Sequence, residues 1–96
     1  MNEQEATDLL RSTLATYRRV SYESLRERLG KGEHLQITGA SGAEYQIEVQ
    51  FFWDGASGGP IRVMGSIADG GWRSFVPLCE SFVLGSDGLF VGEGGA

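Results

Sequence analysis

The sequence predicts an α+β domain, with two N-terminal helices packed on one face of an antiparallel meander sheet of about five or six strands. Apolar residues recur with the period of a helix up to residue 30 and with the period of a strand from residue 34 onward. Helices that are segregated from strands in this way are typical of α+β domains. The chain shows no strand–helix–strand alternation, which argues against a doubly wound nucleotide-binding fold.

The chain has 96 residues, 41% of them hydrophobic, which is enough for one domain with a core. We therefore expect a single domain over 1–96, with a helical part over 4–30, a sheet over 34–92 and a frayed tail over 93–96. Glycine is about twice as frequent as its usual share of about 7%. Most of the 15 glycines fall between predicted strands, where turns need a positive φ.

Two helices are predicted. The first spans 5–19, because its apolar side chains form one stripe: Ala6, Leu9, Leu10, Thr13, Leu14 and Tyr17. Asn2 and Glu5 have the spacing of a capping box at its start. The pattern restarts at Ser21, a good N-cap, and predicts a second helix over 22–29 that ends at Gly30. A single bent helix over 5–29 is the alternative.

Strand periodicity begins with a short strand that contains Leu35 and Ile37, followed by a strand over 44–53 with clean alternation. Placing Ile37 opposite Tyr45 leaves a three-residue loop in which Gly42 takes the left-handed conformation. A third strand is predicted over 61–67.

The remaining strands are predicted from turn signals. Asp69-Gly70 is a two-residue hairpin signal that places Ile67 opposite Trp72, with a fourth strand over 72–76. A last hairpin joins 82–84 to 89–91 around Ser86-Asp87-Gly88, where two- and three-residue turns both fit.

Charge is unevenly distributed along the chain. Residues 1–33 hold six acids and six bases, so the net charge of −5 lies wholly after residue 33. An acidic surface opposes binding to nucleic-acid phosphates. The polar N-terminus does not resemble a signal peptide, and no apolar run is long enough to span a bilayer. We expect a cytoplasmic protein that binds neither nucleic acid nor membrane.

No residue pattern predicts catalysis or a cofactor. One cysteine and one histidine are too few for a disulfide or for a metal site with soft ligands. Ser57 lies in a G-x-S-x-G match that no helix follows. Cys79, expected to be buried or half-buried, has only His34 to activate it, and His34 is expected to lie exposed at an edge. Glu44 and Glu48, four residues apart on one strand face, are about 13 Å apart, too far for a paired-carboxylate site.

The outward sheet face is the candidate binding surface. The predicted pairing places Phe52 opposite Arg62, Met64 opposite Phe75, and Arg73 opposite Ser66. Aromatic residues, Met and Arg are enriched in the cores of protein interfaces. The sequence favours a second interpretation equally: the last hairpin folds over this face, which then becomes a second core layer and not an exposed patch.

The leading hypothesis is therefore a small non-enzymatic domain that binds another protein through a sheet face or an edge strand. It would act as an adaptor, an inhibitor or immunity-type partner, or a chaperone-like dimer. Its acidity favours a basic partner, and a second copy of the chain is the other option. The alternative is a small-ligand-binding domain, with a pocket between the first helix and the sheet that is lined by Tyr17, Tyr45, Trp53 and Trp72.

Overall fold

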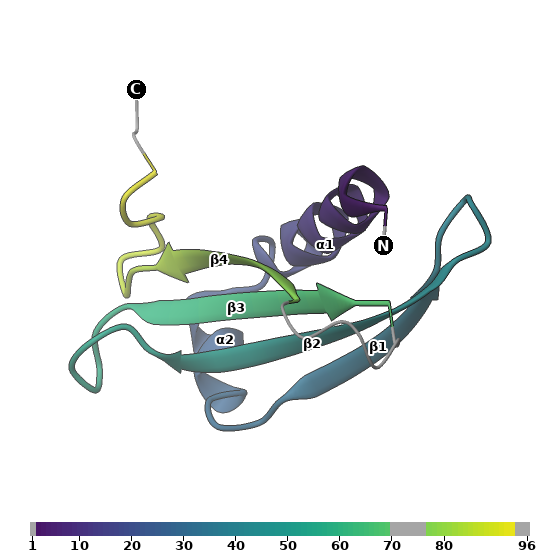
Figure 1. Ribbon diagram of the computed structural model, residues 1–96. Coiled ribbons are helices and arrows are strands. Elements are labelled where there is room, and N and C mark those ends of the chain that lie inside the picture. Colours follow the sequence, from purple (N-terminus) through teal and green to yellow (C-terminus); the bar gives the residue numbers. More distant parts are fainter. Residues whose placement is uncertain (1, 70–76, 94–96) are drawn as a thin grey trace.

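The computed structural model, which describes residues 2–69 and 77–93, has two helices followed by an antiparallel sheet (Figure 1). The elements are α1 (Glu3–Tyr17), α2 (Tyr22–Glu27), β1 (Glu33–Thr38), β2 (Glu44–Trp53), β3 (Ile61–Ala68) and β4 (Leu78–Leu84). The strands form one meander in the order β1-β2-β3-β4. The predicted α+β class is confirmed, but the described residues form four strands and not five or six.

Side-chain caps explain why the helical segment divides into two helices. The Asn2 side chain accepts a hydrogen bond from the Glu5 N–H at the start of α1, and Ser21 accepts one from the Ser24 N–H at the start of α2. Each cap satisfies a backbone donor that the helix leaves without a partner. The single bent helix is therefore excluded. Gly30, at φ +76°, closes the helical part, and its N–H donates to the carbonyl of Phe51.

The first two hairpins follow the predicted register. Ile37 lies opposite Tyr45, and Phe52 opposite Arg62. Gly42 has a φ of +91°, as the three-residue turn requires. Side chains in β2 alternate between exposed and buried from Glu44 to Phe51, which is the pattern of a strand with one face in the core.

The pairing beyond β3 corrects the sequence prediction. Ile67 lies opposite Leu78, so its predicted pairing with residue 72 is wrong. The neighbours of Met64 and Ser66 on this side are Ser81 and Cys79, and not Phe75 and Arg73. The predicted strand over 72–76 lies outside the described residues.

Burial explains why the non-local pairing prevails over the local turn signal. In β4, Phe82 and Leu84 are 3% and 4% exposed and belong to the core. Burying two large apolar side chains contributes about 1.5–3 kcal/mol each, more than a turn preference does. Because side chains alternate along a strand, only one of two adjacent registers can place both on the core face.

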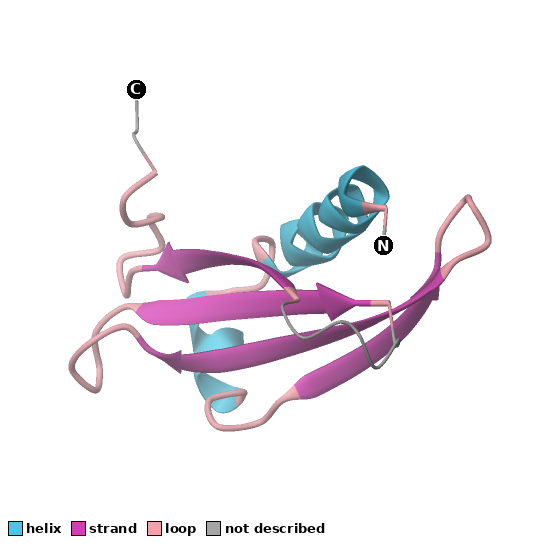
Figure 2. Ribbon diagram, in the orientation of Figure 1, coloured by secondary structure: helices cyan, strands magenta, loops and turns pink. Residues whose placement is uncertain are grey.

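The core lies between the helices and the inner face of the sheet; Figure 2 shows α2 behind the strands and α1 beside the upper edge of the sheet. α1 contacts β3 and β4, and α2 contacts β3. At Gly65 the approach is close: a Cβ there would lie 2.9 Å from Leu10 Cδ1 and 3.1 Å from a methyl carbon of Leu14. Among the described residues, no helix is long and apolar enough to cross a membrane.

A carboxylate fixes the start of α1 against the first hairpin. Glu5 accepts hydrogen bonds from the Ser41 hydroxyl (2.6 Å), the Ser41 N–H (3.0 Å) and the Tyr45 hydroxyl (2.8 Å). These hydrogen bonds, that of the Ser41 side chain above all, hold the pKa of Glu5 below its usual value. The ionised form of Glu5 therefore stabilises the contact between α1 and the β1–β2 turn.

Candidate interaction surface

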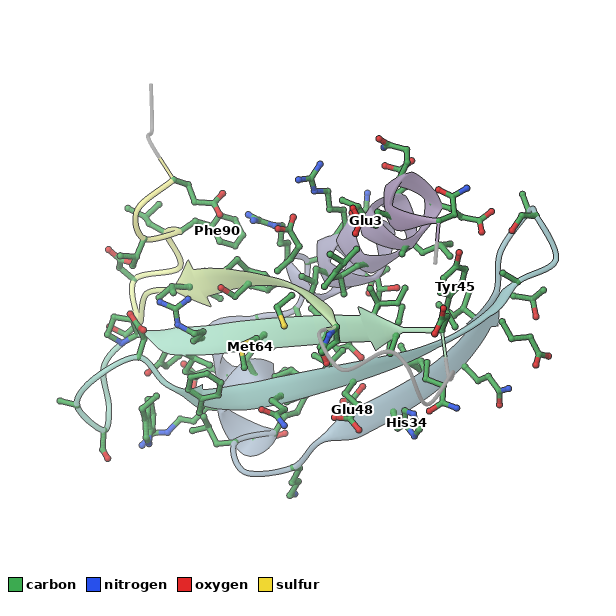
Figure 3. The ribbon with its side chains drawn as sticks, viewed as in Figure 1. Glu3, His34, Tyr45, Glu48, Met64 and Phe90 are labelled. Atoms are coloured by element: carbon green, nitrogen blue, oxygen red, sulfur yellow. The ribbon has the colours of Figure 1, made fainter. Side chains whose placement is uncertain are left out.

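The sheet face turned away from the helices, called the outer face here, has a polar half and an apolar half. The outward side chains of β1 and β2 are polar from His34 to Gln50, and they are exposed. Those near β3 and β4 include Met64 and Val83. Figure 3 shows His34, Glu48 and Met64 along this face.

One row of side chains crosses the whole apolar half. Phe52 lies opposite Arg62, and Arg62 lies opposite Val83. The Val91 N–H donates to the carbonyl of Val83 (2.9 Å), next to the Leu84–Phe90 bridge, so Val91 continues the row beyond β4. We call Phe52, Arg62, Met64, Val83 and Val91 the outer-face patch.

Arg62 is held in the middle of the patch by two neighbours. Its Nε donates to Asp54 Oδ1 (3.0 Å), and its Nη1 donates to Ser81 Oγ (2.8 Å). The Asp54 carboxylate balances the charge of Arg62, whose neighbours across the sheet are the apolar residues Phe52 and Val83. The arginine therefore adds to the contact area without adding a net charge.

The patch is partly open to solvent. Phe52 is 37% and Val91 48% exposed, whereas Val83 is 7% exposed although it lies outside the main core cluster. Large apolar side chains at this exposure, gathered in one row, are typical of binding surfaces. The exposure of Phe52 agrees with the exposed-patch alternative, and a binding role for these residues stays a prediction.

Two adjoining hollows lie along β2 on the side away from Arg62, and Phe52 lines one of them. They form because β1 begins only at Glu33, opposite Val49, so the end of β2 has no strand on that side. One, of about 270 Å³, is lined by residues 30–32 and by Gln50 and Phe52. The adjoining one, of about 240 Å³, is lined in part by His34 and Glu48. A hollow lined by Phe52 and Lys31 therefore adjoins one lined by Glu33 and Glu48.

The last hairpin extends the sheet. Its turn has three residues, because the Gly85 N–H donates to the Leu89 carbonyl and the Gly88 N–H to the Gly85 carbonyl. Phe90 packs edge-on against the core residue Phe82, with ring centroids 5.8 Å apart. Phe90 thus lies on the helix side, and this hairpin does not cover the outer face as a second core layer.

The predicted site residues are brought together only in part. Phe52, Arg62 and Met64 lie on the outer face as predicted, whereas Arg73 and Phe75 lie outside the described residues. Sequence reasoning missed Val83 and Val91, because the register of the last hairpin was left open. The position of Gly88 in the sequence could have indicated a three-residue turn like the one at Gly42, and both glycines have a positive φ, +83° and +91°.

The candidate nucleophiles are not assembled into a catalytic site. Cys79 is exposed, which contradicts the expectation of a buried or half-buried cysteine. It shares a cross-strand row with His34, but on opposite edges of the sheet. Three strand spacings of about 4.8 Å separate the two residues by roughly 14 Å. Ser57 lies in the loop between β2 and β3, well beyond the row that contains His34.

No metal or ligand site is evident within residues 2–69 and 77–93. No three His, Cys, Asp or Glu side chains in these ranges are grouped so that they could hold a metal ion. Tyr45 is fully buried and Tyr17 is 7% exposed, and their hydroxyls donate to Glu5 and Glu33. Both tyrosines are core residues. Trp53 is half-buried, and Trp72 lies outside the described ranges.

Comparisons with protein-family models, with curated proteins and with solved structures give no match. The function is therefore inferred from the geometry of this chain alone.

Proposed function

We propose that this protein is a non-enzymatic binding domain, and that its outer-face patch holds a partner protein with an apolar side chain flanked by basic groups. The observation that carries the proposal is the row from Phe52 to Val91, which places partly exposed apolar side chains around a fixed Arg62. In this arrangement both helices pack on the inner face, so no helix of the described residues covers the outer face. A cytoplasmic location remains part of the proposal.

The chemistry of the partner follows from the charges beside the patch. Glu44 and Glu48 are exposed on the same face, and Glu48 lines the hollow that adjoins the one at Phe52. Arg62 does not offset these acids, because it is paired with Asp54. A Lys or Arg of the partner beside Glu48 would complement this half, and the net charge of −5 would steer a basic protein toward it.

The small-ligand hypothesis is the second candidate, and it has less support. Two of the four side chains expected to line its pocket, Tyr17 and Tyr45, fill the core. Their hydroxyls are bonded within the protein and are not left to meet a ligand.

The proposal is tested with Phe52→Glu and a matched control, Ala15→Glu, which adds the same charge at an exposed position on α1. Partners captured from cells by the wild type and by both variants are identified, and the affinity of the purified partner is measured by calorimetry. Because Phe52 is a partly exposed aromatic side chain of the patch, and aromatic side chains are enriched among the residues that dominate binding energy, we expect about 30-fold weaker binding for Phe52→Glu. Ala15→Glu should bind within about twofold of the wild type.

Folding and salt dependence complete the test. Phe52→Glu should keep the cooperative unfolding of the wild type, since Phe52 is not a core residue. Binding to a basic partner should weaken as salt is added. The proposal is wrong if no protein is retained in a Phe52-dependent manner, or if the partner protects α1 rather than β2 and β3 from hydrogen exchange.

A further inference from the structure

The edge strand β1 offers unused hydrogen-bonding groups on its far side. The Gly39 N–H donates to the Ala43 carbonyl (2.8 Å), which makes these two residues a hydrogen-bonded pair. Such pairs alternate along an antiparallel ladder, so Ile37 with Tyr45 and Leu35 with Ile47 are hydrogen-bonded as well. The N–H and C=O groups of residues 34, 36 and 38 therefore point away from β2. Within the described part of the chain, no strand pairs with them.

This edge lacks the features that usually prevent pairing with another chain. Residues 34–38 contain no proline and no Lys, Arg, Asp or Glu. The register runs without a bulge from Glu33 to Thr38. Natural edge strands are commonly protected by charges, prolines, bulges or covering segments.

The opposite edge of the same sheet has such protection. Pro77 precedes β4, and the charged Glu80 lies within it. Its end is covered, because Leu84 forms a bridge with Phe90 and the Val83 carbonyl accepts the Val91 N–H. The contrast singles out β1 as the edge that is suited to pairing.

Apolar side chains reinforce this inference. Leu35 and Ile37 point to the inner face and are only half-buried at the margin of the core. The main helix contacts are with β3 and β4, so these two side chains lie beyond the helices. An added strand would complete their burial.

We propose that a second copy of this chain pairs its β1 antiparallel with this one, across a two-fold axis through Gln36, to form a continuous eight-stranded sheet. In this register Leu35 lies opposite Ile37 of the second copy, and His34 lies opposite Thr38. The outward N–H and C=O groups at residues 34, 36 and 38 of both copies then form six backbone hydrogen bonds. The contact is isologous and closed, as in most homodimers.

The side chains of β1 favour this register, and they favour a second copy of the chain as the strand that pairs with β1. An axis through Leu35 would place Ile37 opposite Glu33, and an axis through Ile37 would place Leu35 opposite Gly39. Only the axis at Gln36 pairs both apolar residues with each other. Glu33, at the end of the strand, is already bonded to Tyr17 and Arg28. The strand pair therefore brings no unpaired carboxylates of the two acidic copies against each other, because residues 34–38 carry no acid and Glu33 is bonded within its own chain.

The first test is the mass in solution as a function of concentration. One strand pair buries little area, below the roughly 1,200 Å² of a standard interface, so we expect a dimer that dissociates on dilution. Gln36→Pro should abolish the dimer and keep the sheet, since the lost N–H points away from β2. Gln36→Lys, which places two lysines on the axis, should also give a monomer. Gln46→Lys is the matched control on the neighbouring strand and should remain dimeric.

The second test fixes the register by cross-linking. In a Cys79→Ser background, Gln36→Cys should form a disulfide-linked dimer on oxidation, because opposite Cα atoms in a hydrogen-bonded pair are about 5.5 Å apart. Gln46→Cys should not, because its partner would be about 14 Å away, three strand spacings.

The inference is overturned by a monomer at all concentrations up to about 1 mM, where even a weak dimer would form. It is also overturned by a dimer that survives Gln36→Pro, or by equal cross-linking of both cysteine variants. Loss of the dimer in Phe52→Glu would show that the outer face is the self-contact, and it too would overturn the pairing through β1. The inference does not depend on the proposed partner. A dimer that is unchanged by Phe52→Glu is compatible both with capture of a partner through Phe52 and with no such capture.

Discussion

The guanidinium of Arg18, at the end of α1, holds both carboxylate oxygens of Glu93 through Nη1–Oε1 and Nη2–Oε2 contacts of 2.7 Å each. The same guanidinium lies 4.8 Å and 5.0 Å from the ring centroids of Phe82 and Phe90. Arg18 thus fastens the last hairpin to the first helix. Glu93, predicted as the start of a frayed tail, is held by this ion pair, and residues 94–96 lie outside the described ranges.

Replacing Arg18 should loosen the C-terminal segment without unfolding the domain. In Arg18→Gln the ion pair and both cation–π contacts are lost, so we expect faster amide exchange at Val91, whose N–H is bonded to Val83. Amides in the centre of β2 should be unchanged. Arg18→Lys should restore little, because an ammonium cannot bind a carboxylate in the two-pronged manner or stack on a ring as a guanidinium does.

The adjacent Arg19, which is exposed, supplies the control for this experiment. Arg19→Gln makes the same chemical change one residue away and should leave exchange at Val91 as it is in the wild type. Equal acceleration in both variants would mean that net charge, and not the contact with Glu93, governs the segment.

A larger residue at Gly65 should destabilise the protein although the position is in a strand. β-Branched residues favour strands, and glycine in a strand interior costs about 0.5–1 kcal/mol relative to alanine. At Gly65, however, a Cβ meets Leu10 and Leu14 at 2.9–3.1 Å. We therefore expect Gly65→Val to lower the free energy of unfolding by about 1–3 kcal/mol, as overpacking does. Urea denaturation measures this.

The control for Gly65→Val is Gly32→Ala. At Gly32 the only close atom is the Val49 carbonyl oxygen, 3.8 Å from the added Cβ. The stability should change by less than about 0.5 kcal/mol. If Gly65→Val were as stable as the wild type, α1 could not pack as closely on β3 as the structure indicates.

The parts of the fold that the sequence predicted depend on local patterns. The caps at Asn2 and Ser21 and the alternation in β2 each need only a few neighbouring residues, and all three were found. The pairing of β3 with the strand that follows it was predicted from the Asp69-Gly70 turn and was wrong, because burial of β4 against α1 outweighs a turn preference. A turn signal depends only on neighbouring residues, so it cannot indicate how well β4 packs against α1, which lies far away in the sequence.

Charge was visible in the sequence, but its arrangement was not. The bases of the helical part and the acids of the sheet part meet in space: Arg11 pairs with Glu80 and Arg18 with Glu93. The net charge that looked like a property of one half is therefore partly balanced across the core. Glu44 and Glu48 on the outer face form no ion pair with a Lys or Arg among the described residues, and they are the acids that bear on the proposed partner.

Tyr17 links α1 to β1 through Glu33, and this contact should govern the stability at high pH. Its hydroxyl donates to Glu33 Oε1 (2.5 Å), and Arg28 Nη1 donates to Glu33 Oε2 (3.0 Å). Burial, followed by the hydrogen bond and the charge of Glu33, raises the pKa of Tyr17 from 10.0 to about 12.

The sign of the effect follows from which state ionises first. The unfolded chain loses the Tyr17 proton near pH 10 and the folded chain near pH 12, so the stabilisation is complete below pH 10 and is lost as the pH rises to about 12. In urea denaturation at pH 8–11, Tyr17→Phe should be less stable than the wild type at pH 8 by about 1 kcal/mol, and the gap should narrow above pH 10. Glu33→Gln removes the charge and should move the Tyr17 phenolate absorbance to lower pH; an unchanged titration in that variant would rule out Glu33 as a cause.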